Sequence, residues 1–234
     1  MKILGLDTST AMTSVAVLDG ERVAIATSPH GGRGADVLVH VDRACRELGI
    51  APRELDAVAI GAGPGSFTGL RIGMATAKGI AFAAGRPLWA VSSLAALAWD
   101  AVATAPVDAV ICAALDARRG EVYAGCFRRD AAHGVTELDP ERVLAPAELP
   151  AWAAALAAGA PLACTGDALA AYPDALAALA TGWRAQTPSG RAVAELARRG
   201  ARVDVLVAGT PTYIRPSEAE VMYPDGVPGA LRRR

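Results

Sequence analysis

The chain has 234 residues, of which 53% are hydrophobic and 20% are charged, and its net charge is −1 at neutral pH. This length fits one large domain or two small ones, and the hydrophobic fraction excludes a disordered chain. The balanced charge and the low aromatic content of 5% argue against a protein that binds nucleic acid on its own.

The four cysteines, Cys45, Cys112, Cys126 and Cys164, show no metal-ligand spacing and no C-x-x-C pair. Cys45 and Cys112 stand in apolar patterns that are typical of small core residues, which indicates a reduced intracellular protein. Asp7 interrupts the apolar stretch that a signal peptide needs, and a membrane-spanning helix is not expected. We therefore expect a soluble, cytoplasmic protein.

The first half of the chain predicts three antiparallel strands followed by alternating helices and strands. Short apolar or β-branched runs indicate strands at residues 3–6, 13–18 and 23–27, with Asp19-Gly20 as a hairpin turn. Apolar residues at helical spacing predict a helix over 35–48, ended by Gly49. The rest of this half is predicted as a strand at 57–60, a helix at 68–84, a strand at 88–91 and a helix from Ser92 or Ser93 to about 103.

The second half, from about residue 106, repeats that order. A continuous apolar run at 109–115 and a returning strand at 121–127 enclose a turn at 116–120. Helices are predicted at 146–158, 167–180 and 189–199, and the proline-rich stretch from 210 onward is predicted to be irregular. A strand-rich start followed by helices and strands, run twice, predicts an α/β protein with two related subdomains.

Asp7, Thr8, Ser9 and Thr10 follow the first strand and fit two interpretations. A carboxylate at a strand end, followed by hydroxyls, can hold a hydrated Mg²⁺ and donate to phosphate oxygens. The same residue types also form ordinary turns in which the side chains satisfy the backbone, and the sequence alone favours that interpretation.

A glycine-rich loop precedes the 68–84 helix. Its motif residues are Gly63, Pro64, Gly65, Ser66, Phe67 and Thr68. Glycine permits backbone paths that are closed to other residues, and a helix N-terminus attracts anions. The loop lacks the G-K-[ST] of a P-loop, and Pro64 interrupts any G-x-G-x-x-G pattern.

Small residues recur every four positions along the 68–84 helix, at Gly69, Gly73, Ala77 and Ala81. One face of the helix is therefore almost bare of side chains, which lets another backbone approach closely. Other faces are apolar too, so the helix is expected to be buried on more than one side. The pattern leaves open whether the chain itself or a partner covers the bare face.

Other catalytic patterns are missing from the sequence. The three histidines, His30, His40 and His133, form no H-x-x-x-H pair, so we expect no metal site, and no G-x-S-x-G marks a serine hydrolase. Arginine pairs such as Arg118-Arg119 are more typical of a solvated surface than of an RNA site.

Four segments form a specific series in chain order: ILGLDTST at 3–10, GPGSFTGLRIG at 63–73, VSSL at 91–94 and LDARRGEVY at 115–123. A weaker echo follows in PTYIR at 211–215. This series resembles the bacterial TsaB (YeaZ) family.

The resemblance implies an α/β, actin-like fold of the sugar-kinase and Hsp70 (ASKHA) type, with two related lobes that each open with antiparallel strands. We expect residues 1–105 to form the N-terminal lobe, joined by a C-terminal helix at about 189–215. Residues 106–188 then form the C-terminal lobe, and residues 216–234 form an irregular tail. In this fold the turn from Asp7 to Thr10 is expected to be a vestige of a nucleotide-binding phosphate loop.

The resemblance also implies a part in making threonylcarbamoyladenosine beside the tRNA anticodon. In that family TsaB is the non-catalytic partner of the paralogue TsaD, which holds the metal and transfers the threonylcarbamoyl group, and the ATPase TsaE joins them. We therefore expect TsaD and TsaE as partners, a homodimer when TsaD is absent, and contact with tRNA only through the complex. We expect no tightly bound cofactor on this chain, because ATP or ADP and the metal belong to the partner subunits.

The family implies an interface with TsaD, or with a second copy, on the helices at 35–48 and 68–84. Its expected residues are Val37, Leu38, Val41, Cys45, Leu48, Gly69, Leu70, Gly73, Met74, Ala77 and Ala81. The paralogue binds its metal through two histidines one turn apart; here that helix carries only His40, which favours a scaffold without catalytic residues. In place of the paralogue's second phosphate loop stands a hairpin with Asp116, Arg118, Arg119, Gly120 and Glu121.

An enzyme is the alternative: an ATP-dependent phosphotransferase or ATPase of the same superfamily that acts through Asp7. The missing histidine pair and the missing second phosphate loop weigh against it. Tight binding of Mg-ATP to the isolated chain, abolished by Asp7→Ala and measured by calorimetry, would favour this alternative.

Overall fold

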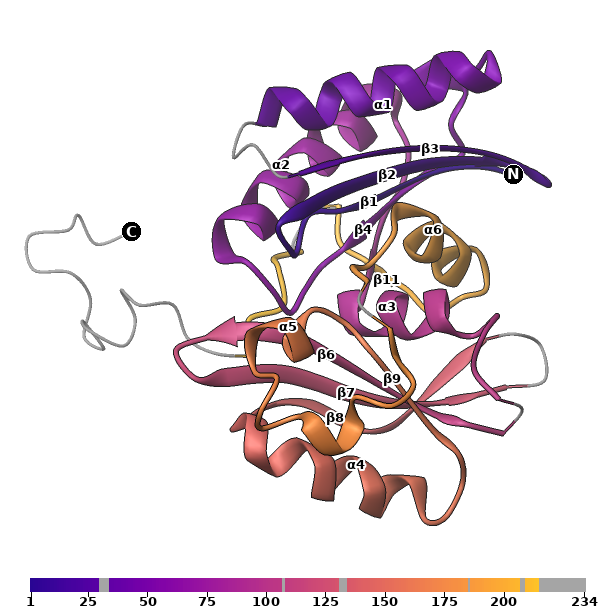
Figure 1. Cartoon of the computed structure of the whole chain (residues 1–234). Helices are drawn as coiled ribbons and strands as arrows, with labels where there is room; N and C mark the ends of the chain where they lie inside the picture. Colours follow the sequence, from indigo (N-terminus) through magenta and orange to yellow (C-terminus); the bar gives the residue numbers. More distant parts are fainter. Residues whose placement is uncertain (30–33, 107, 131–133, 185, 207–208, 215–234) are drawn as a thin grey trace, which may run out of the picture.

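The computed structural model of the chain describes residues 1–29, 34–106, 108–130, 134–184, 186–206 and 209–214 (Figure 1). Two β-sheets lie one above the other in Figure 1, with helices between them and on their outer faces. The tail predicted at 216–234 lies outside the described residues.

The first sheet holds five strands from the first half of the chain and one short strand from near residue 203. In sheet order these are β11 (Val203–Asp204), β5 (Leu88–Val91), β4 (Ala57–Gly61), β1 (Lys2–Asp7), β2 (Met12–Asp19) and β3 (Arg22–Pro29). Helices α1 (Gly34–Leu48) and α2 (Phe67–Ala84) cover one face and enclose a core with the strands. Helices α3 (Ser93–Ala101) and α6 (Gly190–Arg198) pack on the other face.

The second sheet is built entirely from the second half of the chain. In sheet order its strands are β10 (Trp183–Arg184), β9 (Leu162–Thr165), β6 (Val110–Arg118), β7 (Glu121–Arg129) and β8 (Val135–Leu144). Helices α4 (Leu149–Ala157) and α5 (Ala168–Ala171) pack on its outer face. Helix α3 packs on its inner face and therefore lies between the two sheets.

The two sheets share one strand order, which confirms the predicted fold class. In the first sheet, β1 pairs antiparallel with β2 and parallel with β4. In the second, β6 pairs antiparallel with β7 and parallel with β9. Read across the first sheet, the strands come in the order β3-β2-β1-β4-β5, and across the second sheet in the equivalent order β8-β7-β6-β9-β10. The same strand order is thus used twice, as in the duplicated actin-like fold.

The predicted helix ends are set by local chemistry. Ser66, Ser92 and Ser189 precede α2, α3 and α6, and each hydroxyl accepts a bond from a backbone N–H in the first turn of its helix. Gly85 ends α2 in the left-handed conformation, at φ 64°. The strands and helices predicted in the first half are all present within a few residues of their expected bounds.

The helix predicted at 167–180 is wrong. Only α5 and a 3-10 turn at Ala177–Leu179 form there, because Pro173 lacks an N–H and disfavours helical backbone at Tyr172. The predicted C-terminal helix at 189–215 is also too long, since α6 ends at Arg198.

The sequence did not indicate β8, β9, β10 or β11. Strand β8 lies at the edge of its sheet, contains Pro140 and is mostly half-buried or exposed, so it shows no apolar alternation. Strands β9, β10 and β11 have only two to four residues each, too few for a periodic signal.

Candidate protein-docking surface

The turn that follows β1 is closed inside the protein. Asp7 is fully buried, and its carboxylate accepts bonds from the Ser9 N–H, the Ser9 hydroxyl and the Ser93 hydroxyl at 2.6 to 2.8 Å. Burial raises the pKa of Asp7, and the bonds from Ser9 and Ser93 oppose that shift. Because both oxygens are occupied and hidden from solvent, this carboxylate is not presented to a hydrated Mg²⁺.

The glycines in and next to the motif pack directly against this turn, where there is no room for a side chain. A Cβ atom at any of four glycines would lie only 1.9 to 2.3 Å from an atom of Asp7, Thr8 or Ser9; these are Gly61, Gly65, Gly69 and Gly73. Thr8 is fully buried and donates its hydroxyl to the Gly69 carbonyl at 2.8 Å. The first half of the bare face of α2 is therefore filled by the chain's own polar turn, and Ala77 and Ala81 pack in the apolar core.

Most of the predicted interface residues face the interior. Nine of them are buried: Val37, Val41, Cys45, Gly69, Leu70, Gly73, Met74, Ala77 and Ala81. The chain itself covers these side chains, which corrects the expectation that they contact a partner. Of the remaining two, Leu48 is half-buried and Leu38 is 51% exposed.

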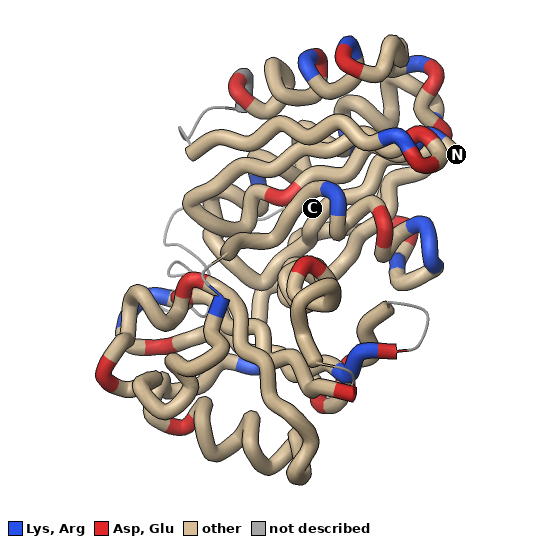
Figure 2. Tube along the Cα trace, turned by 45° about the vertical axis from the view of Figure 1, so that its right-hand side comes forward, with Lys and Arg blue, Asp and Glu red and all other residues tan. Residues whose placement is uncertain are grey.

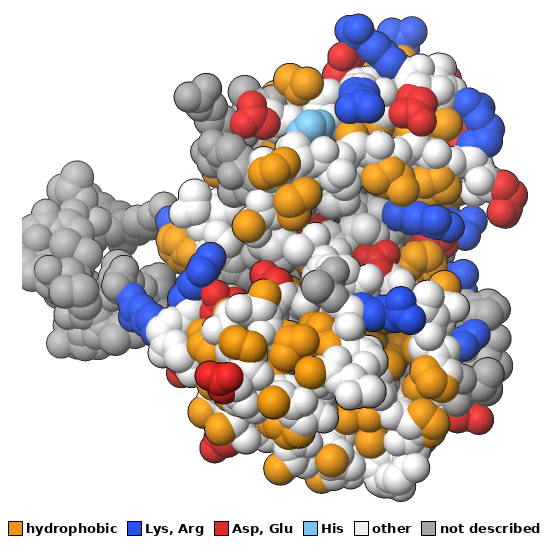
Figure 3. Space-filling model, viewed as in Figure 1, with side chains coloured by type: hydrophobic (Ala, Val, Ile, Leu, Met, Phe, Trp, Pro, Cys, Tyr) orange, Lys and Arg blue, Asp and Glu red, His pale blue; other side chains and the backbone are white. Residues whose placement is uncertain are grey.

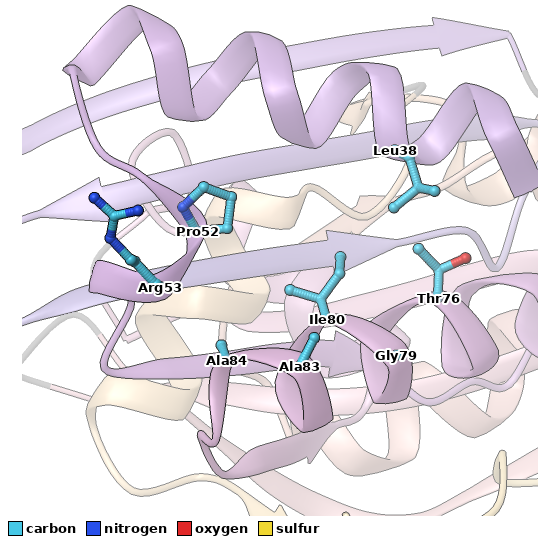
Figure 4. Close-up of a pocket in the computed structure, with 8 residues that line it drawn as sticks. All are labelled: Leu38, Pro52, Arg53, Thr76, Gly79, Ile80, Ala83 and Ala84. Atoms are coloured by element: carbon cyan, nitrogen blue, oxygen red, sulfur yellow. The ribbon is translucent and has the colours of Figure 1, made fainter.

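The surface that another molecule can reach on α1 and α2 is an apolar groove between the two helices (Figure 4). It has a volume of about 420 Å³ and is lined by Leu38, Pro52, Arg53, Thr76, Gly79, Ile80, Ala83 and Ala84. Leu38 points from α1 toward Thr76 and Ile80 of α2. A Cβ atom at Gly79 would meet nothing within 4 Å, so the backbone of α2 is open to close approach there.

The same two helices carry further exposed apolar side chains outside the groove lining. Phe82 on α2 is 81% exposed and Val39 on α1 is 64% exposed. The outer side of α1 carries charges of both signs (Figure 2), including an Arg46–Asp42 ion pair at 3.0 Å. The groove thus has an apolar centre and a charged border, which is the usual composition of a protein interface.

The motif loop between β4 and α2 runs from the interior to the surface. Gly63 and Pro64 are buried, whereas Ser66 and Thr68 are exposed and the Phe67 ring is 37% exposed. The buried half of the loop is fixed from β5 and α3, since Ser93 donates its N–H to the Gly63 carbonyl at 2.8 Å. The exposed half begins α2, at the opposite end of the helix from the groove residues Ala83 and Ala84.

The predicted second-lobe hairpin lies away from that surface, at the end of β6 and β7. Arg118, Arg119 and Gly120 have φ values of 63°, 58° and 77°, so the tip is shorter than predicted and β6 continues to Arg118. Asp116 accepts bonds from the Arg118 N–H and the Tyr172 hydroxyl at 2.8 and 2.9 Å.

The same hairpin is anchored to the sheet on its other side. The Asp116 N–H donates to the Asp167 carboxylate at 2.8 Å, and burial raises the pKa of Asp167. Glu121 begins β7 directly after the tip and is half-buried. The five predicted hairpin residues thus lie together at the end of β6 and β7. The Asp116 carboxylate is bonded there within the chain, and the hairpin does not form an open phosphate loop.

A carboxylate from each sheet lies at the N-terminal end of helix α3, buried in the case of Asp7 and half-buried in the case of Glu141. Ser93 donates to Asp7 of the first sheet, and Ser92 donates to Glu141 of β8 in the second sheet. Burial raises the pKa of Glu141 to about 7, with the Ser92 bond opposing the shift and nearby Glu137 adding to it. The positive end of a helix dipole favours carboxylates at this place.

A third carboxylate, that of Asp100, holds the start of α6. Asp100 of α3 accepts bonds from the Ser189 N–H at 2.9 Å and the Ser189 hydroxyl at 2.7 Å. Burial raises its pKa to about 6, with Ser189 opposing that shift. Asp100 and Glu141 were missed from the sequence, because no local pattern marks a side chain whose partner is 49 to 89 positions away.

The described part of the chain lacks two features, a membrane-spanning helix and a cluster of metal ligands. Within the residues described above, no helix is both long and apolar enough to span a bilayer. Over those same ranges, no three His, Cys, Asp or Glu side chains are grouped so that they could hold a metal ion. On the face drawn in Figure 3, acidic and basic side chains are interspersed.

Comparisons with known proteins agree with the motif series. A family model described as "TsaD: tRNA N6-adenosine threonylcarbamoyltransferase" matches residues 35–212. The solved structure "YeaZ from Pseudomonas aeruginosa" is 30% identical with a TM-score of 0.73, and the match covers 87% of this chain and 97% of that one. The chain belongs to the TsaB (YeaZ) family. Both comparisons cover most of the chain, beyond the motifs of the first half.

Curated TsaB relatives match over a shorter range. "tRNA threonylcarbamoyladenosine biosynthesis protein TsaB" of Haemophilus influenzae is 40% identical over 53% of this chain and 52% of its own length. The Escherichia coli protein of that name is 37% identical over 56% of each chain. The TsaB-family chain described here thus spans about half the length of the curated relatives it matches.

Proposed function

We propose that this chain is a non-catalytic docking subunit of the complex that makes threonylcarbamoyladenosine beside the tRNA anticodon. Its partner is TsaD, which it binds and activates together with TsaE in the cytoplasm, and tRNA is met only through that complex. ATP or ADP and the catalytic metal belong to the partner subunits. In the absence of TsaD, the same surface can bind a second copy of the chain.

The apolar groove between α1 and α2 supports this proposal most strongly. It offers an open helix backbone at Gly79 and the exposed side chain of Leu38. Exposed apolar surface bordered by charge is typical of a protein-binding site. The Asp7 turn, by contrast, is closed and has its hydrogen bonds satisfied within the chain, as a scaffold requires and an ATPase does not.

Charge placed in the groove is expected to abolish docking. Leu38→Glu and Ala83→Glu each put a carboxylate on an exposed position of the groove, so the fold is unaffected but an apolar contact is lost. We expect each variant to weaken TsaD binding by about 30-fold or more, the effect of losing an interface hot spot. Titration calorimetry with purified TsaD measures this loss.

Ile25→Glu provides the matched control. Ile25 is 44% exposed on β3, and its neighbour Ala24 faces the core under α1, so Ile25 points to the opposite face of the sheet. This variant should bind TsaD like the wild type. Unchanged binding by Leu38→Glu and Ala83→Glu, with circular dichroism as in the wild type, would refute docking through the groove.

A further inference from the structure

A second stripe of α2 connects the groove to the start of the helix. The residues at every fourth position from Phe67 are all exposed; they are Phe67, Arg71, Ala75, Gly79 and Ala83. This stripe lies on the opposite side of α2 from the buried stripe that contains Gly73 and Ala77. With a rise of 1.5 Å per residue, it forms a docking line of about 24 Å, and because each four-residue step turns about 40° around the helix axis, the line winds around α2 between the groove and Phe67.

The line ends on a cluster of three side chains, which we call the aromatic patch: Phe67, Arg71 and Tyr213. The Phe67 and Tyr213 rings are 5.2 Å apart between centroids, and each residue is 37% exposed. The Arg71 guanidinium carbon lies 3.9 Å from the Phe67 ring centroid, and Arg71 Nε donates to the Tyr213 hydroxyl at 3.3 Å. Tyr, Phe and Arg are the residue types enriched at protein interfaces.

Tyr213 is held in place from several sides. It belongs to the segment at 209–214, in which the Gly209 carbonyl accepts a bond from Lys78 of α2 at 2.5 Å. The Thr212 N–H donates to the Ala62 carbonyl at 2.7 Å, and Ile214 packs on the core of the second sheet. A patch that is already ordered loses little conformational freedom when a partner binds.

Arg71 leaves charge available to a partner. Its described bond uses Nε only, and among the described residues no Asp or Glu forms an ion pair with it. Its two outer nitrogens are suited to a carboxylate, which arginine binds in a bidentate way.

We propose that the aromatic patch is a second anchor for the partner that docks in the groove, and that this partner places a carboxylate on Arg71 and an apolar side chain on the rings. This inference rests on the proposed function, because it extends the same docking surface along α2. It also makes the segment at 209–214, which contacts the loop after β4 and the core of the second sheet, part of the interface.

The test is a titration of TsaD with the full chain and its variants. Arg71→Glu and Tyr213→Ala should each weaken binding by about 10-fold or more, whereas Tyr213→Phe, which keeps the ring, should stay within about 3-fold of the wild type. Raising the salt concentration should weaken the wild type more than Arg71→Glu, since a charge pair is screened. Arg128→Glu, a charge reversal at an exposed position of β7, is the control and should bind normally.

The outcomes separate this inference from the proposed function. If Arg71→Glu and Tyr213→Ala bind within about 2-fold of the wild type while Leu38→Glu does not bind, the patch is not an anchor and the groove alone docks TsaD. If the wild type itself fails to bind TsaD, the proposed function fails and the second anchor fails with it. Should Tyr213→Ala lose its fold, Arg71→Glu decides, because its side chain is exposed.

Discussion

Replacing Gly73 by alanine is expected to lower the free energy of unfolding by about 2 to 4 kcal/mol. The new methyl group would lie 2.1 Å from Thr8 Oγ1 and 3.2 Å from Ile60 Cδ1, and both of these residues are buried. The turn or the helix must then move apart, which breaks the bond from Thr8 to the Gly69 carbonyl. This cost exceeds the gain in helix propensity of about 1 kcal/mol that alanine brings.

Gly79→Ala in the same helix makes the matched control, with the opposite sign. Nothing lies within 4 Å of a Cβ atom there, so the helix-propensity gain of about 0.5 to 1 kcal/mol should appear undiminished. Urea unfolding of the two variants measures both values. Equal effects at the two positions would contradict the close packing of α2 on the Asp7 turn.

Glu141→Gln is expected to change how stability depends on pH. Burial raises the pKa of Glu141 to about 7 in the folded protein, above its ordinary value of 4.5. The folded state therefore binds this proton more tightly, and the resulting stability is present below pH 4.5 and lost as the pH rises through 7. The loss is up to about 3 kcal/mol at pH 8.

Glutamine keeps the shape of the side chain and can still accept the bond from Ser92 without titrating. At pH 8 the variant should therefore be more stable than the wild type by up to about 3 kcal/mol, and the two should converge near pH 4.5. Urea unfolding at several pH values, with Glu47→Gln at an exposed position of α1 as the control, measures the difference. Parallel curves for Glu141→Gln and the wild type would show that Glu141 is not held in a buried, charge-poor environment.

The fold is predictable from the sequence wherever a local pattern is strong. Alternating strands joined by Asp19-Gly20 and the serine cap at Ser92 appear as expected. Strand β8 is not predictable in this way, because its place is set by pairing with β7 and its own residues are polar. A helix such as 167–180 is overpredicted when alanine content is weighed above a single proline.

The candidate docking surface could not be predicted from the sequence for a different reason. Helix α2 has two stripes of small residues, one with Gly73 and Ala77 and the other with Gly79 and Ala83. Helical periodicity places each stripe on one face, but it does not say which neighbour covers that face. The partner of Gly73 is Thr8, 65 positions earlier in the chain, so only the folded structure reveals that this stripe is internal. The stripe with Gly79 and Ala83 is the one that remains exposed to a partner.

Reconstitution of tRNA modification tests the central claim most directly. Threonylcarbamoyladenosine on tRNA would be measured with purified TsaD and TsaE, ATP and an activated threonylcarbamoyl donor, in the presence and absence of this chain. We predict that modification requires the chain. The Ile25→Glu variant should support modification as well as the wild type, whereas a Leu38→Glu/Ala83→Glu double variant should not support it. Modification by this chain without TsaD, or full activity with the double variant, would contradict a docking subunit that acts through the groove between α1 and α2.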